Sequence, residues 1–140
     1  MELIERSEAT DDIKASARRN VMAEEARVAL ARGDLDLAER LIDEHHRAIA
    51  GRGDLFEQQR AHELAGRLAL AQGEPKRALF ELAKANQQDP RVLILNAQAF
   101  SAAGDRTAAR AACEEVVHLN QISLPLAFVR KPARNLLREL

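Results

Sequence analysis

The sequence predicts an all-α protein built from about three helix-turn-helix hairpins and a C-terminal capping helix. Three observations support this prediction. Ala, Leu, Arg and Glu dominate the composition, and these residues have high intrinsic helix propensity. Gly, Pro and acidic residues recur at intervals that divide the chain into segments of helical length. Apolar residues follow helical spacing within these segments, and the runs of Val, Ile and Thr that are typical of strands are missing.

The turn residues mark where each helix begins and ends. Asp34, Asp54 and Asp105 can cap helices, and Pro75 and Pro90 suit the first turn, where the missing N–H costs nothing. We expect residues 121–129 to be irregular and a last short helix to begin at Pro132. The earlier helices are expected at 11–32, 35–49, 54–72, from 75 onward, at 90–104 and at 105–119.

Apolar stripes at helical spacing predict which residues form the core. Aromatic residues make up only 3% of the chain, and Trp and Tyr are absent. The core must therefore be built from Ala, Leu, Ile and Val, which suits closely packed helices. The predicted core residues are Ala38, Leu41, Ile42, His45 and Ile49, then Ala78, Leu79, Leu82 and Ala85, then Ala109, Ala112, Cys113 and Val116.

Length and charge limit the classes of function. The 140 residues suit a single domain over 1–140, and the formal net charge of -1 disfavours binding to nucleic acid or an anionic membrane. Residues 1–20 contain five acidic side chains and no apolar run, so we expect neither a signal peptide nor membrane insertion. The single Cys113 cannot form an internal disulfide, which suits a reducing compartment, and we expect a cytoplasmic protein.

A short motif recurs three times, at residues 33–38, 73–78 and 104–109. Each copy reads Gly, acidic residue, three variable residues, Ala. Gly ends one helix, the acidic residue favours the N-terminus of the next, and the small Ala lets two helices cross closely. The motif therefore predicts an internal repeat of helical hairpins.

This repeat resembles the tetratricopeptide repeat, a helix-turn-helix unit of 34 residues. The middle copy matches best, with Gly66, Gly73, Ala78, Ala85 and Pro90 at the family's small and Pro positions. The third copy keeps Ala97, Phe100, Gly104 and Ala109, and the first keeps Ala26, Gly33 and Ala38. The chain departs from the family at His45 and at the bulky first-helix position, which is occupied by Met22, His62 and Leu93. The resemblance implies a right-handed superhelix of repeats at about 19–52, 59–92 and 90–123 with a capping helix at 131–140, as in small bacterial proteins of this family.

In this family the first helix of each hairpin lines a concave groove that binds a peptide or helix of a partner protein. Arg27, Arg60, Arg67 and Arg91 suggest a partner with acidic and aliphatic side chains, unless they pair with acids of the chain itself. A fifth helix without charge from Val92 onward is either covered on nearly all sides or presents an apolar strip to the partner. The groove residues that the resemblance implies are Asn20, Glu24, Arg27, Leu30, Arg60, Glu63, Leu64, Arg67, Leu70, Arg91, Ile94, Leu95, Gln98 and Ser101.

The residues that could carry chemistry argue against an enzyme or a metalloprotein. Glu44, His45, His46, His62 and Glu63 contain no ligand pair at i, i+4 spacing, so we expect no metal and no cofactor. Arg40 and His45 match the spacing of a helical ribonuclease family, but His45 lies on the packing stripe, where a core histidine with satisfied hydrogen bonds is the commoner case. We therefore expect no catalytic residues.

The leading functional prediction is a non-catalytic adaptor or scaffold. Two alternatives remain, a secretion chaperone for an apolar export substrate and a structural module that assembles with copies of itself. The self-assembling module would use either an uncapped end of the repeats or the apolar segment 123–129. This segment either caps the repeats of its own chain or docks as a free arm into a second copy.

Overall fold

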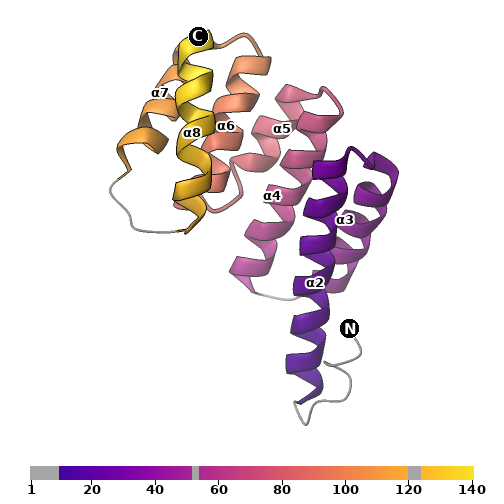
Figure 1. Cartoon of the computed structure of the whole chain (residues 1–140). Helices are drawn as coiled ribbons and strands as arrows, with labels where there is room; N and C mark the ends of the chain where they lie inside the picture. The colour runs from indigo at the N-terminus through magenta and orange to yellow at the C-terminus, as the bar shows by residue number, and fades with distance from the viewer. Residues whose placement is uncertain (1–9, 52–53, 120–123) are drawn as a thin grey trace.

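The computed structural model describes residues 10–51, 54–119 and 124–140, and this part of the chain is all-α, with seven helices and no strand (Figure 1). Short turns at residues 33–34, 72–74 and 103–105 separate consecutive helices, as predicted. Their bounds are α2 (Asp11–Arg32), α3 (Leu35–Ile49), α4 (Leu55–Ala71), α5 (Pro75–Leu82), α6 (Pro90–Ala102), α7 (Arg106–His118) and α8 (Leu124–Glu139). None of the described helices is both long and apolar enough to cross a membrane.

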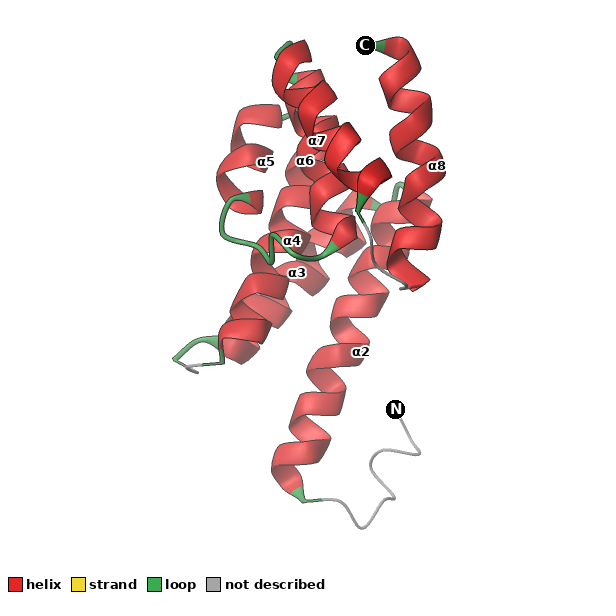
Figure 2. Cartoon of the chain, turned by 90° about the vertical axis from the view of Figure 1, so that its left-hand side faces the viewer, coloured by secondary structure: helices red, strands yellow, loops and turns green. Residues whose placement is uncertain are grey.

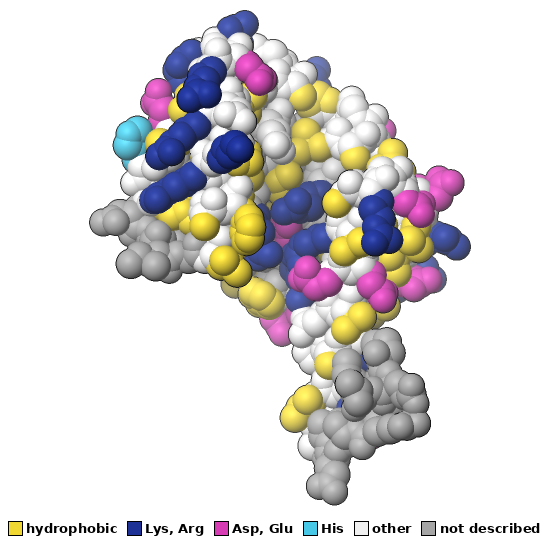
Figure 3. Space-filling view, in the orientation of Figure 1, with side chains coloured by type: hydrophobic (Ala, Val, Ile, Leu, Met, Phe, Trp, Pro, Cys, Tyr) yellow, Lys and Arg dark blue, Asp and Glu magenta, His cyan; other side chains and the backbone are white. Residues whose placement is uncertain are grey.

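The helices pack in two layers (Figures 1 and 2). Each helix contacts the next along the chain, and α2 also contacts α4, α4 contacts α6, and α6 contacts α8. Among the described residues, α3, α5 and α7 make no such contacts with one another. We call α2, α4, α6 and α8 the inner layer and α3, α5 and α7 the outer layer. The surface is hollowed between α8 and α2, as Figure 3 shows.

The predicted turn chemistry is confirmed at the helix ends. Gly33, Gly73 and Gly104 have φ values of 75°, 75° and 84°, which a residue with a side chain rarely adopts. The carboxylate of Asp34 accepts a hydrogen bond from Leu37 N, and Asp105, Asp54 and Asp89 likewise accept bonds from backbone N–H groups of the helices that follow them. These local contacts explain why the chain reverses where the motif recurs.

The predicted core is largely confirmed. Leu41, Leu79 and Ala112 are half-buried, and the other residues of the three stripes are buried. Gly66 explains the closest approach of two helices, because a Cβ atom at this position would lie 2.6 Å from Leu82 Cγ on α5. Gly66 is therefore needed for its size at the α4–α5 crossing.

The start of the last helix differs from the prediction. We expected an irregular segment over 121–129 and a capping helix at 131–140, whereas α8 begins at Leu124 and Pro132 lies inside it. Pro125 lies in the first turn of α8, where the missing N–H costs nothing. It occupies the position that was predicted for Pro132. Leu126 and Val129 are buried against α6 and α7, and this burial offsets the hydrogen bond that Pro132 removes.

Segment 124–129 thus packs on its own chain, as the capping interpretation expects, although Leu124 and Phe128 are 72% and 71% exposed. Some predictions fall on residues that the structure does not describe. These residues are the expected ends of the first and third repeats at 52 and 123, and most of the acidic residues within 1–20 that argue against a signal peptide.

Candidate binding groove

The predicted groove residues lie on α2, α4 and α6, the helices beneath the hollow of the inner layer (Figure 3). The structure separates them by exposure. Asn20, Glu24 and Gln98 are exposed. The half-buried members are Leu30, Arg27, Arg60, Arg67, Leu70, Arg91 and Ser101, and the buried members are Glu63, Leu64, Ile94 and Leu95.

The buried apolar members belong to the core and do not face a groove. Leu64 is fully buried beside Ala23 and Ala26 of α2, Ile94 packs against α7 and α8, and Leu95 belongs to the core cluster of α4, α5 and α6. This result favours the first interpretation of α6, which carries no charge after Arg91 and in which Val92 to Leu95, Ala97 and Ala99 are buried, whereas Gln98 is exposed. Its apolar side chains hold the layers together and present no strip to a partner.

Glu63 joins two of the predicted arginines across helices. Its carboxylate accepts hydrogen bonds from Arg27 Nη2 at 2.5 Å and from Arg67 Nε at 2.6 Å. Burial alone would raise the pKa of Glu63, but the hydrogen bond from Arg27 and the charges of Arg67 and Arg27 bring this pKa below its usual value. Glu63 is therefore an ionised, 4% exposed anchor that fixes two guanidinium groups in place.

A second ion pair connects α2 with α4 beneath the surface. Arg19 Nε lies 2.7 Å from Glu57 Oε1, and both side chains are buried. Arg60 Nη2 lies 3.8 Å from the same oxygen, and Arg60 also donates to Asn20 and lies over the ring of Phe56 at 5.3 Å from its centroid. Burial lowers the pKa of Arg60, although Glu57 opposes that shift.

Arg91 is the most exposed of the four predicted arginines, with 39% of its side chain accessible. It binds the Asp89 carboxylate at the start of α6, with Nη2 2.7 Å from Oδ2 and Nε 3.1 Å from both oxygens. Burial would raise the pKa of Asp89, but the hydrogen bonds from Arg91 lower it. The structure thus supports the interpretation that these arginines pair with acids of their own chain.

Among the described residues, the ion pairs beneath the hollow contain more arginines than carboxylates. Arg19, Arg27, Arg60, Arg67 and Arg91 face four carboxylates, those of Glu24, Glu57, Glu63 and Asp89. The cavity at their centre is only about 30 Å³, so a ligand would have to lie across this surface and not inside a pocket. Its lining is Arg27, Phe56, Gln59, Arg60, Glu63, Asn86, Asp89, Arg91 and Val92.

Two residues of the alternative metal interpretation, His46 and His62, line one cavity of about 240 Å³. His45 is fully buried, whereas Arg40 of the ribonuclease spacing is exposed. His62 Nδ1 lies 2.8 Å from Glu81 Oε2 of α5, an acid that the sequence interpretation did not single out. Within the described ranges, no cluster of three or more His, Cys, Asp or Glu side chains could hold a metal ion.

The environment of His45 is unusual because neither ring nitrogen has a hydrogen-bond partner. Burial, followed by the charge of Arg60, lowers the pKa of His45 from 6.5 to about 4, so the ring is neutral at pH 7. The sequence predicted a buried histidine with its hydrogen bonds satisfied. Its burial is confirmed, and the satisfied hydrogen bonds are not found.

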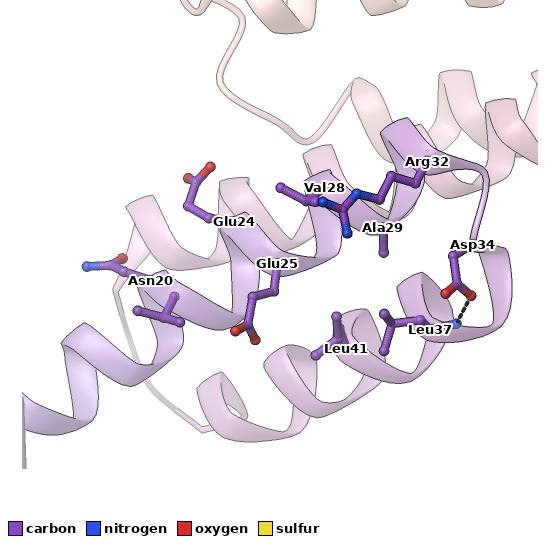
Figure 4. Close-up of a pocket in the computed structure, with 10 residues that line it drawn as sticks. Asn20, Glu24, Glu25, Val28, Ala29, Arg32, Asp34, Leu37 and Leu41 are labelled. Carbon is purple, nitrogen blue, oxygen red and sulfur yellow. Dashed lines mark hydrogen bonds between the residues drawn. The ribbon is translucent and has the colours of Figure 1, made fainter. Parts of the chain in front are cut away.

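The structure also contains a larger groove, and two of the predicted residues, Asn20 and Glu24, contribute to its lining, whereas the sequence prediction missed the rest of it. It lies between α2 and α3 and has a volume of about 690 Å³ (Figure 4). Its signal in the sequence was weak, because Leu41 was assigned to the core stripe and Val28 and Leu37 look like ordinary helix residues.

The tetratricopeptide resemblance remains a prediction from the repeat motif. No family model, curated protein or solved structure matches this chain.

Proposed function

We propose that this chain is a non-catalytic interaction module of the tetratricopeptide type, which binds an extended or helical segment of a partner protein across the inner layer. The observation that carries the proposal is the excess of arginine over acidic side chains beneath the hollow. The partner segment would carry acidic and aliphatic side chains. The lone, buried and free Cys113 supports a reducing, cytoplasmic setting for this interaction.

The ion pairs within the chain support binding because they hold the arginines in position. Glu63 and Asp89 fix Arg67 and Arg91, which are 26% and 39% exposed. In the described part of the chain only Nε of Arg67 is engaged, so its two Nη groups can donate to a carboxylate of a partner. Less side-chain entropy is lost on binding when a guanidinium is already ordered, which favours affinity.

The apolar contacts of the proposed groove come from a few accessible residues. Phe56 is 64% exposed beside Arg60, and Leu70 is half-buried on α4. A partner with aliphatic side chains among its acids could cover both. The proposed contact residues are therefore the accessible members of the predicted set: Asn20, Glu24, Arg27, Leu30, Arg60, Arg67, Leu70, Arg91, Gln98 and Ser101.

The test compares groove variants with a matched outer-layer control. The tagged chain captures its partner from the native lysate, and the partner is then produced separately for affinity measurements. Arg67→Glu should weaken binding at least about tenfold, since a charge-assisted bond becomes a repulsion. Arg77→Glu, at an exposed arginine of α5 that is also paired with a local acid, should leave the affinity unchanged.

A second groove variant separates binding from folding. Gln98 is exposed and has no hydrogen bond to another residue in the described part of the chain, so Gln98→Glu adds a repulsive charge without breaking an ion pair. Circular dichroism and thermal unfolding would check that each variant is folded. Wild-type affinity of both Arg67→Glu and Gln98→Glu for the captured partner would refute the proposed groove.

A further inference from the structure

The groove between α2 and α3 is an apolar surface at one end of the stack (Figures 1 and 4). Nothing in the described part of the chain covers it, and Val28 and Leu37 remain 48% and 36% exposed. Leu37 and Leu41 of α3 point toward α2, and Glu25, Arg32 and Asp34 surround the opening (Figure 4). We call this surface the α2–α3 groove.

A second uncovered surface lies on α8 at the other end of the stack (Figure 1). Leu124 and Phe128 form its apolar part. Lys131, Arg134 and Arg138 follow on the same exposed side, and Figure 3 shows dark-blue side chains gathered over this helix. We call the surface formed by these five residues the α8 face.

The two surfaces are complementary in charge and polarity. Among the residues that line the α2–α3 groove, Glu25 and Asp34 exceed the single Arg32 even without Glu24, whose carboxylate pairs with Arg27, so the rim is acidic. The α8 face carries three basic side chains and no acid. Both surfaces have an apolar part, whose burial favours association by roughly 25 cal/mol per Å².

The α8 face cannot reach the α2–α3 groove of its own chain. No contact joins α8 to α2 or α3 in the described structure, and Figure 1 shows these helices at opposite ends. The segment 1–9 of the chain is a poor occupant by composition, since Glu2, Glu5 and Glu8 outnumber Arg6 and would be repelled by the acidic rim.

We propose that the α8 face of one copy docks into the α2–α3 groove of a second copy. Because two different surfaces meet, one copy of the pair keeps a free α2–α3 groove and the other keeps a free α8 face after the first contact. Such a head-to-tail contact continues into a ring if the rotation closes and into an open chain if it does not. This proposal does not depend on partner binding by the inner layer.

Sedimentation velocity provides the first test. The molar mass of the wild-type chain should rise above that of a monomer between about 1 µM and about 1 mM, the range of weak protein contacts. Raising the salt concentration should reduce the association, because the charged rims are exposed. A wild-type chain that stays monomeric over this range at low salt would overturn the proposal.

Two variants and their mixture identify the interface. Val28→Asp should disable the groove, and Phe128→Glu should disable the α8 face, each weakening association at least about tenfold. Both positions are exposed, so the monomer should fold normally. Phe80→Glu replaces a ring of similar exposure, 62%, on the outer layer and should associate as the wild type does.

The mixture of Val28→Asp and Phe128→Glu should form dimers and nothing larger, because it contains one intact groove and one intact α8 face. A contact between two like surfaces gives a different result, since only one of the two variants would then lose association. A mixture that remains monomeric while the wild type associates would also overturn the proposal.

Discussion

Replacing His45 with Leu should make the protein more stable at neutral pH and less sensitive to mild acid. His45 is fully buried on α3, and neither of its ring nitrogens has a hydrogen-bond partner. Leu has a similar size and no polar atom that must be removed from water. A buried polar group without a partner costs about 1–3 kcal/mol, so His45→Leu should raise the free energy of unfolding at pH 7 by about that amount.

The pH dependence provides a larger and more specific signal. Burial chiefly, followed by Arg60, lowers the pKa of His45 to about 4, while Glu57 opposes the shift and Arg19 and His46 add to it. Between pH 6.5 and 4 the unfolded chain binds a proton that the folded chain rejects, so the free energy of unfolding falls as the pH falls. At about 1.4 kcal/mol per pH unit, the full loss is about 3 kcal/mol.

Chemical denaturation at pH 7 and pH 4.5 measures this effect. The stability advantage of His45→Leu over the wild type should grow by about 2–3 kcal/mol between these values, since only the wild type carries the histidine penalty. His46→Leu is the matched control, because His46 is exposed, and it should follow the wild type. Parallel loss of stability in His45→Leu and the wild type over this range would refute the buried, neutral state of His45.

Three further substitutions test the packing, each by its effect on the free energy of unfolding. Gly66→Ala should cost about 1–3 kcal/mol, because the new Cβ atom would lie 2.6 Å from a buried leucine of α5; an unchanged stability would contradict the close crossing. Arg19→Met should cost about 3 kcal/mol, because Glu57 loses the guanidinium that lies 2.7 Å from its Oε1. The double variant with Glu57→Leu should recover part of this loss. Equal costs for the single and double variants would contradict the pairing. Leu126→Ala should cost about 2–5 kcal/mol and Phe128→Ala less than about 0.5 kcal/mol, since their side chains are 1% and 71% exposed; similar costs would show that α8 is not docked as described.

The positions of most helices could be predicted because their end signals are local. Gly33, Gly73 and Gly104 adopt the left-handed conformation that the turn requires, and Asp34 and Asp105 cap the helices that follow, whereas Glu74 makes no such side-chain bond. The last helix was misplaced because Pro125 and Pro132 carry the same local signal. Burial of Leu126 against α6 and α7 distinguishes them, and that contact depends on the tertiary structure.

The predicted groove residues lie on the inner-layer helices, but the sequence did not indicate which of their side chains are accessible. The tetratricopeptide resemblance placed Leu64 and Ile94 in the groove, yet contacts with neighbouring helices bury both. The Arg27–Glu63 pair joins residues 36 positions apart, so no i, i+3 or i, i+4 pattern reveals it. The missing hydrogen-bond partners of His45 depend on the packing of three helices, which sequence spacing does not describe.

Nuclear magnetic resonance titration of the labelled chain with the captured partner segment tests the central claim most directly. The Nε–H signals of Arg67 and Arg91 and the side-chain amide of Gln98 should shift as the partner is added, because all three lie on the inner layer. Arg77, on the outer layer, should not respond. Shifts confined to α3, α5 and α7, with Arg67, Arg91 and Gln98 unchanged at saturation, would contradict binding across the inner layer.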